Sequence, residues 1–233
     1  MPYKSTITFT LDTICPWTYL GYLRLAKALS AFRSSNPDSP VTFTLLLTPY
    51  QLYPEFSKDG VDKYAWYRDE KYAGSEERMG MYVEYMTALG RDEGVEMRWK
   101  AEGEEGGVIA NTFEAHRILH VLQEEYSSDH ALRALEALYE QYFCQAQNPS
   151  SAPTLHQACT KAGLGAEQVK EIVGDAEMGK RETKAKIREQ AGNGVDSVPY
   201  VVFEGRKRDF TLVGAKSVGE YVKVLGQVEK EAR

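Results

Sequence analysis

The stretch STITFTLDTICPWTYLGYLRLAKAL, residues 5–29, contains the change of pattern that decides the fold. Its first nine residues are rich in β-branched side chains and alternate apolar with polar positions, which is typical of a strand. Pro16 suits the first position of a helix, and apolar residues then recur at helical spacing as far as Phe32. Cys15 therefore lies where a predicted strand gives way to a predicted helix.

A second strand follows this helix. Residues 41–50, VTFTLLLTPY, carry the apolar run of a strand in a sheet that is covered on both faces. Strand, helix and strand with a crossover of this length predict a βαβ unit. Strand patterns return in SVPYVVFEG and KRDFTLVG, and a last helix is predicted over residues 215–231.

The segment between these two parts is mostly helical in pattern. Neither flanking part has a complete sheet without the other, so the sequence predicts an α/β domain with an insertion. We expect residues 1–60 and 191–233 to form this domain, and residues 61–190 to form a large all-helical insertion that acts as a lid.

Composition excludes several classes of function. The 233 residues carry a net charge of −6, which argues against a nucleic-acid partner. Nothing approaches the continuous apolar run of a membrane span, and the first residues lack the apolar region of a signal peptide. Three widely separated cysteines do not make a disulfide framework, so we expect a cytoplasmic protein without a membrane partner.

Four stretches, in this order along the chain, resemble the DsbA-like thioredoxin family, and specifically its FrnE-type oxidoreductases with a helical insertion. They are DTICPWTYLG, NTFEAHRILH, SVPYVVFEG and LVGAKS. The same architecture resembles kappa-class glutathione transferases and hydroxychromene-carboxylate isomerases. The resemblance implies a thioredoxin-like fold, β-α-β…β-β-α, with Cys15 as the nucleophile at the start of the first helix.

The motif itself departs from the family pattern. FrnE-type members normally have C-P-W-C, whereas this chain has Thr18 at the position of the resolving cysteine. Kappa-type members typically place a serine where this chain has Cys15. Thr18 cannot resolve a mixed disulfide, which disfavours a two-cysteine cycle. Its hydroxyl could donate a hydrogen bond to a thiolate one turn away, or it is simply a tolerated small polar residue.

The position of Cys15 bears on its reactivity. Free N–H groups and the positive end of the helix dipole favour the thiolate, so we expect a pKa below the free value of about 8.5. The alternative is an inert, half-buried cysteine in a degenerate member of the family. Cys144 and Cys159 lie among apolar helical positions, and we expect both to pack in the core.

The resemblance implies a second wall for the site. Pro199 is implied to follow a cis peptide bond and to face Cys15, and the backbone at Val198 would pair with an extended substrate or with glutathione. Pro16 and Trp17 would complete the binding surface. The Ser-Asp pair with which kappa-type proteins hold glutathione is absent from GAKS; Lys216 could hold a carboxylate there instead, or it is merely exposed.

One predicted helix carries further polar candidates. His116 and His120 have the i, i+4 spacing of two metal ligands, but no third ligand is evident, so we expect no metal site. A role for His116 facing the site or hydrogen-bonded in the core is the better interpretation. Asn111 precedes the helix and is a plausible N-cap near the cleft.

Aromatic residues are abundant. The chain has 15 Tyr, 3 Trp and 8 Phe, and many of them lie in the inserted segment. A lid rich in tyrosine would suit a planar or polyunsaturated small molecule. Packing in the core and on the surface at helical spacing explains the same pattern and is the interpretation we favour.

Three functions remain open from the sequence. The first is a thiol oxidoreductase with a single active cysteine that uses glutathione as the resolving thiol and acts on a thiol, a disulfide or a small molecule. The second is a glutathione- or thiolate-dependent isomerase or transferase acting on a hydrophobic small molecule. The third is a binding protein that has lost the chemistry. The resemblance also allows a homodimer.

Overall fold

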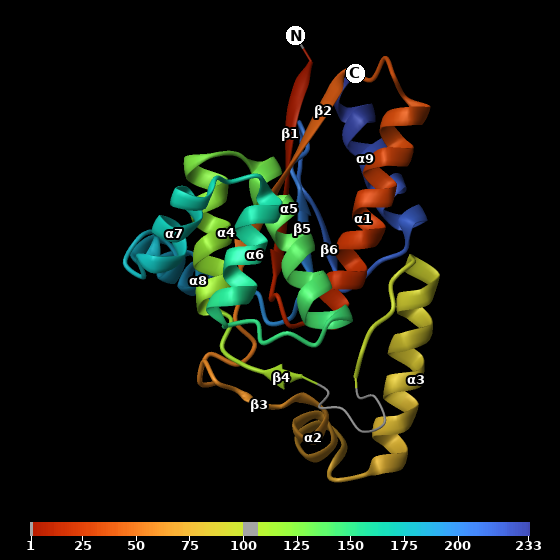
Figure 1. Cartoon of the computed structure of the whole chain (residues 1–233). Helices are drawn as coiled ribbons and strands as arrows, with labels where there is room; N and C mark the ends of the chain where they lie inside the picture. The colour runs from red at the N-terminus through yellow and green to blue at the C-terminus, as the bar shows by residue number, and fades with distance from the viewer. Residues whose placement is uncertain (1, 100–106) are drawn as a thin grey trace.

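A four-stranded sheet forms the centre of the molecule (Figure 1). The structure is a computed structural model and describes residues 2–99 and 107–233. The strands lie in the order β2-β1-β5-β6, with β1 and β2 parallel and the other pairs antiparallel. They are β1 (Tyr3–Leu11), β2 (Val41–Pro49), β5 (Tyr200–Phe203) and β6 (Phe210–Val213).

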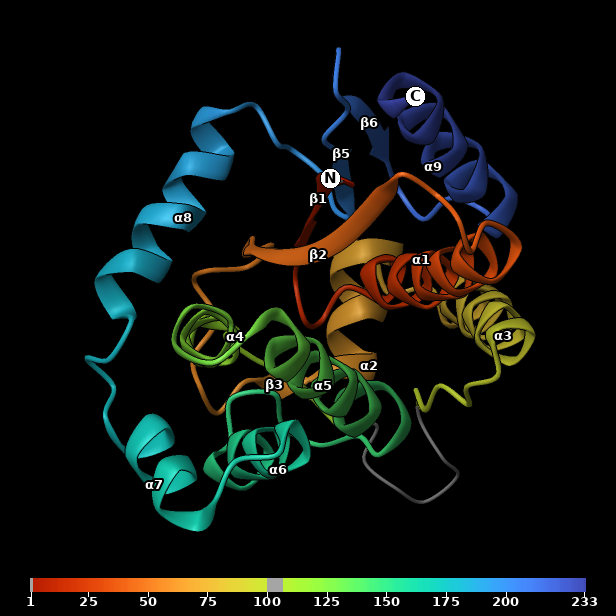
Figure 2. The ribbon, with the colours of Figure 1, turned by 90° about the horizontal axis from the view of Figure 1, so that it is seen from above.

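Helices surround this sheet (Figure 2). Helix α1 packs beside α9, while α4, α5 and α8 contact β2. The helices are α1 (Pro16–Ser35), α2 (Lys63–Trp66), α3 (Glu76–Glu93), α4 (Phe113–Glu125), α5 (Ser128–Tyr139), α6 (Ala152–Ala162), α7 (Ala166–Gly174), α8 (Lys180–Gly192) and α9 (Val218–Ala232). Two π-helical turns, η1 (Tyr67–Lys71) and η2 (Glu140–Cys144), continue α2 and α5.

The predicted β-α-β…β-β-α order and thioredoxin-like fold are confirmed by this arrangement. One detail differs from the prediction of an all-helical insertion. The segment between β2 and β5 also contains β3 (Val61–Asp62) and β4 (Val108–Ile109), which pair antiparallel. These strands have only two residues each, too short for a period-two pattern to be recognised in the sequence.

Aromatic rings join the first helix to the helical segment. The ring of Tyr19 in α1 stacks on Tyr139 at 4.7 Å and on Phe143 at 5.3 Å between ring centroids. Tyr19 and both partners are buried. Stacked aromatic pairs stabilise beyond the apolar area that they bury, so this cluster fixes α5 and η2 against the helix that begins at Cys15.

A glutamine side chain covers part of the outer strand β2. Gln123 of α4 accepts a hydrogen bond from the Leu47 N–H at 2.8 Å and donates one to the Leu47 carbonyl at 3.3 Å. Within residues 2–99 and 107–233, strand β2 pairs only with β1, and an unpaired edge would otherwise present these groups to another chain. The contact therefore holds α4 in register with β2.

Arg117 connects three parts of the helical segment. Its buried guanidinium donates to Glu114 at 2.7 Å, to the Ile172 carbonyl near the end of α7 at 3.0 Å, and to the Met178 carbonyl before α8 at 3.1 Å. A buried charge is tolerated only with such partners. The side chain thus anchors α7 and the start of α8 to α4.

None of the helices in the described ranges is both long enough and apolar enough to cross a bilayer.

We predict that Arg117→Met destabilises the fold by about 3 kcal/mol, because the buried Ile172 carbonyl and the part-buried Met178 carbonyl lose their donor and Glu114 keeps only Lys58 among the described residues. Urea denaturation followed by circular dichroism measures this change. Arg181→Met is the control, since that side chain is 93% exposed and its loss should change stability by less than about 0.5 kcal/mol. Equal effects of the two substitutions would contradict the anchoring role of Arg117.

Candidate active site

Cys15 occupies the turn between β1 and α1. It is the N-cap residue of α1, and Pro16 takes the first helical position. The Cys15 carbonyl accepts hydrogen bonds from the N–H groups of Thr18 at 3.1 Å and Tyr19 at 3.3 Å, while its own N–H donates to the Asp12 carbonyl at 3.1 Å. This network fixes the backbone on both sides of the sulfur.

The thiol of Cys15 is covered by residues from distant parts of the chain. It is 6% exposed, and Sγ lies 3.8 Å from the Val198 carbonyl oxygen, to which the thiol can donate. Val195 and Val198 form a small buried cluster with Cys15, against which pack Trp17, Tyr50, Leu52 and Tyr200. The site therefore combines the start of α1 with the segments that follow β2 and precede β5.

Close packing of α1 brings Pro199 to this corner. A Cβ atom at Gly21 would lie 2.9 Å from Cγ of Pro199, so a larger side chain would push the proline away. Pro199 is buried, and the Val198–Pro199 peptide bond is cis. Glycine at position 21 therefore keeps the Val198–Pro199 segment near the helix that carries Cys15.

The direction of the Cys15 pKa shift differs from the expectation. Burial raises the pKa of the thiol to about 12, and the negative charge of Asp12 acts in the same direction. Hydrogen bonds from the N–H groups of Thr18 and Trp17 and from the Thr18 hydroxyl act in the opposite direction but are outweighed. The prediction of a lowered pKa is therefore wrong for this structure, because the helix start is sealed from water.

Thr18 is fully buried in the turn. Its Oγ1 lies 2.7 Å from the carbonyl oxygens of both Asp12 and Cys15, and its single proton can be donated to one of them at a time. These bonds tie the first turn of α1 to the end of the preceding loop. Threonine thus has a structural role at the position where related motifs place the second cysteine.

Asp12 and His116 form a buried polar pair beside this turn. Nε2 of His116 lies 3.4 Å from Oδ1 of Asp12, and neither atom makes a hydrogen bond within the described part of the chain. The other carboxylate oxygen of Asp12 accepts the Leu52 N–H at 2.7 Å. His116 therefore faces Asp12, the residue whose charge acts on Cys15.

Four tyrosines lie within electrostatic reach of the thiol. Burial raises the pKa of each phenol, and the charge of a Cys15 thiolate raises it further. Among the described residues, the hydroxyl of Tyr142 has no hydrogen-bond partner, whereas an interaction with the Thr18 side chain acts to lower the pKa of Tyr139. These neutral phenols come from η1, α3, α5 and η2, and are Tyr67, Tyr82, Tyr139 and Tyr142.

The other residues predicted for the site differ in their relation to Cys15. Trp17, which packs on the Cys15 cluster, is half-buried, and its ring centroid lies 6.2 Å from that of Tyr85 in α3. Asn111 accepts a hydrogen bond from the Phe113 N–H at 2.8 Å, although the N-cap residue of α4 is Thr112, one position later than expected.

Lys216 is half-buried immediately before α9, where it contributes to the charge environment of Glu220. It is not part of the cluster that covers Cys15.

The remaining cysteines do not supply a partner for Cys15. All three cysteines are free. Cys159 is fully buried in α6, as expected, whereas Cys144 is only half-buried and lines a cavity formed by α1, α5 and residues 94–96. Cys15 does not line that cavity. The described residues contain no group of three or more His, Cys, Asp or Glu arranged to hold a metal ion.

The sequence does not single out Asp12, Val195, Tyr50 or Leu52. Asp12 carries a weak signal, since an acid three residues before the cysteine ends the strand, but such residues commonly occupy turns. The other three reach the thiol only through the folding of the sheet. Long-range packing of this kind has no local pattern that could reveal it.

The chain matches the DSBA-like thioredoxin domain family over residues 6–226. It is similar to a probable DsbA oxidoreductase from Streptomyces coelicolor, with 25% identity, a TM-score of 0.82, and coverage of 98% of this chain and 92% of that one.

Two further solved structures share the fold. The cytosolic disulfide reductase DsbM from Pseudomonas aeruginosa, solved with GSH, has 13% identity, a TM-score of 0.54 and coverage of 97% and 96%. A 2-hydroxychromene-2-carboxylate isomerase has 10% identity, a TM-score of 0.60 and coverage of 96% and 95%. No curated protein sequence matches the chain significantly.

Burial of Cys15 predicts slow alkylation. At pH 7.5 we expect iodoacetamide to label Cys15 in the folded protein at least about a hundredfold more slowly than in urea, since a raised pKa leaves little thiolate. The rate should keep rising with pH up to pH 10. Peptide mass spectrometry distinguishes the three cysteines, and the unfolded chain is the control. A rate that reaches a plateau below about pH 8 would contradict the raised pKa.

Proposed function

The chain belongs to the DSBA-like thioredoxin domain family, and on that basis we propose that it is a thiol oxidoreductase in which Cys15 acts alone and glutathione completes the cycle. The observation that carries the proposal is the environment of Thr18, whose hydroxyl bonds to the backbone one turn after Cys15. A disulfide partner for Cys15 must then come from another molecule.

In the proposed cycle, the Cys15 thiolate attacks the glutathione sulfur of a mixed disulfide. That S–S bond breaks as the bond between Cys15 and glutathione forms, and the substrate leaves as a thiol after taking up a proton. A second glutathione thiolate then attacks the sulfur of the bound glutathione. Cys15 is released as a thiol and oxidised glutathione is formed, so each mixed disulfide reduced consumes one free glutathione thiol, and the substrate thiol and oxidised glutathione are the products.

Access to the thiol is part of this proposal. A disulfide can reach Sγ only when the side chains packed on Cys15 separate from it. The same separation admits water and removes part of the desolvation that raises the pKa. The N–H groups of Thr18 and Trp17 then favour the thiolate without the opposing effect of burial. The separation of the covering side chains thus both exposes the Cys15 sulfur and lowers its pKa.

The Val198 backbone lies where it could contact a thiol compound, such as glutathione, that is bonded to Cys15. Its carbonyl lies 3.8 Å from Sγ, so a peptide-like compound bonded to Cys15 would run beside this segment and could pair with its backbone. The structural likeness to DsbM, which was solved with GSH, agrees with this choice of compound. Lys216 would serve a glutathione carboxylate only if the ligand extends to the start of α9.

A second candidate function rests on the buried phenols. Among the described residues, Tyr142 has an unpartnered hydroxyl within electrostatic reach of Cys15, as a site that hydrogen-bonds a substrate carbonyl would require. A thiolate at Cys15 could add to an activated double bond there, allow rotation and leave again. The fold shared with a 2-hydroxychromene-2-carboxylate isomerase is compatible with this reaction. The Cys144→Ser variant removes the half-buried thiol. Isomerisation by this variant, without turnover of disulfides, would favour this second function.

We predict that the protein reduces a glutathionylated peptide in the presence of glutathione, and that Cys15→Ser abolishes this turnover. Peptide mass spectrometry of the enzyme during the reaction should find glutathione on Cys15. Cys144→Ser is the matched control and should retain activity. Full turnover by Cys15→Ser, or an adduct confined to Cys144, would refute the proposed role of Cys15.

Asp12→Asn should shift the pH profile of Cys15 alkylation towards lower pH. The Asp12 charge raises the pKa of the thiol, so its removal favours the thiolate at a given pH. Rates measured from pH 6 to pH 10 test this expectation, with Asp38→Asn as the control because Asp38 is exposed in the loop after α1. An unchanged profile, or a shift towards higher pH, would show that Asp12 does not act on Cys15.

A further inference from the structure

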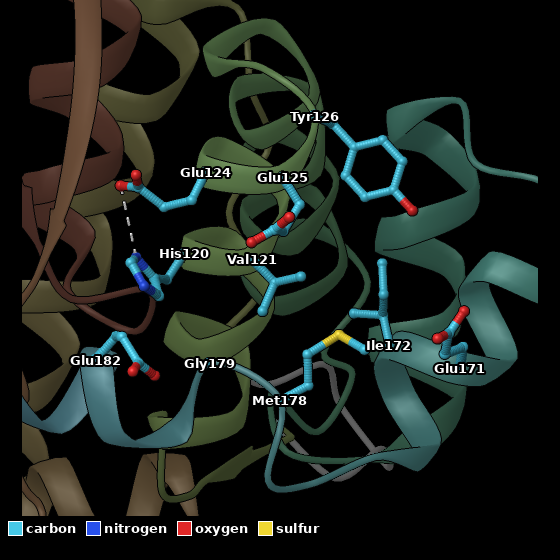
Figure 3. Close-up of a pocket in the computed structure, with 10 residues that line it drawn as sticks. All are labelled: His120, Val121, Glu124, Glu125, Tyr126, Glu171, Ile172, Met178, Gly179 and Glu182. Atoms are coloured by element: carbon cyan, nitrogen blue, oxygen red, sulfur yellow. Dashed lines mark ion pairs between the residues drawn. The ribbon is translucent and has the colours of Figure 1, made fainter.

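A cavity separate from the Cys15 cluster opens between α4 and the α7–α8 segment (Figure 3). Its volume is about 580 Å³, within the range of small-molecule pockets. None of the residues that cover Cys15 lines it. The proposed thiol chemistry does not use this cavity.

The floor of the cavity is apolar. Val121 of α4 and Ile172 of α7 are buried, and the half-buried Met178 lies beside them in Figure 3. Gly179 has φ +69°, and a Cβ there would lie only 2.6 Å from Cγ2 of Val121. Glycine therefore lets the start of α8 approach α4 closely enough to close one side of the cavity.

Four glutamates line the cavity around this floor. Glu124 has one cation near it, Lys186 at 3.8 Å, and Glu182 has Arg181 at 3.6 Å. Glu125 and Glu171 have no ion pair with any described residue. Glu125 and Glu171 are exposed at the cavity, so two of its four carboxylates have no ion-pair partner among the described residues.

A buried polar side chain also lines the cavity. The His120 side chain is 8% exposed and makes no hydrogen bond to any described residue; its Nδ1 lies 3.8 Å from Glu124, too far for one. Burial lowers the pKa of His120, so at neutral pH the imidazole is uncharged and does not offset the glutamates. Its ring lies between Glu124 and Glu182 (Figure 3). The cavity thus offers acceptors and negative charge above an apolar surface.

We propose that this cavity binds a small organic cation, consisting of an ammonium group on an apolar ring or short alkyl body. The apolar part would rest on Val121, Ile172 and Met178, and the ammonium would lie among the carboxylates. An anion such as glutathione is repelled by the same charges, which separates this ligand class from that of the thiol site. The ligand would contact α4 one turn after His116, the partner of Asp12.

Phenethylammonium is a suitable probe, with 2-phenylethanol as a neutral control of nearly the same shape. Methyl NMR of the full chain reports on the cavity through Val121, Ile172 and Met178. We expect saturable shifts of these methyl signals with phenethylammonium and at least about threefold weaker binding of the alcohol. Absence of saturable shifts, or equal binding of the two compounds, would overturn the proposal.

Two double variants separate a specific site from general attraction to an acidic protein. Glu125→Gln with Glu171→Gln should weaken phenethylammonium binding about fivefold. Glu84→Gln with Asp92→Asn removes the same charge from the exposed surface of α3 and should leave binding unchanged. Equal weakening by both pairs would overturn the site. Because Cys15→Ser should still bind the probe, failure of the thiol proposal would not affect this result.

Discussion

Two opposing electrostatic effects meet at the sulfur of Cys15. The start of α1 directs N–H groups towards it and favours a thiolate, whereas burial among Val195, Val198 and aromatic side chains disfavours any charge. In this structure burial is the larger effect, and the pKa lies at about 12. The N–H groups are part of the helix and favour the thiolate at all times. The reactivity of Cys15 therefore depends on whether the side chains that cover it stay in place.

The rest of the fold maintains this balance. Strand β1 and helix α1 fix the position of the sulfur, and Gly21 allows the Pro199 segment to approach it. The aromatic stack on Tyr19 holds α5 and η2 against α1, which brings buried tyrosines close to the site. Thr18 ties the turn together through carbonyl groups. Thr18 thus helps to hold Cys15 in place.

The sequence was informative where its patterns are local. The alternation before Cys15, the proline after it and the apolar run at residues 41–50 were sufficient to predict the βαβ unit, which the structure confirms. The sequence was uninformative where the decisive contacts are long-range. Neither the cover by Val195 nor the pairing of Asp12 with His116 has a local signature. Those long-range contacts bury Cys15 and so raise its pKa. A prediction from the helix start alone gives the opposite direction.

The proposed cycle requires Cys15 to form a disulfide with a thiol compound from solution that lies beside Val198. A crystal structure of the protein treated with oxidised glutathione tests it most directly. We expect a disulfide between Cys15 and glutathione, with the cysteinyl backbone of glutathione hydrogen-bonded to Val198 and the side chains over Cys15 displaced. A free Cys15 in a protein that carries glutathione only on Cys144, or no bound glutathione at all, would contradict it.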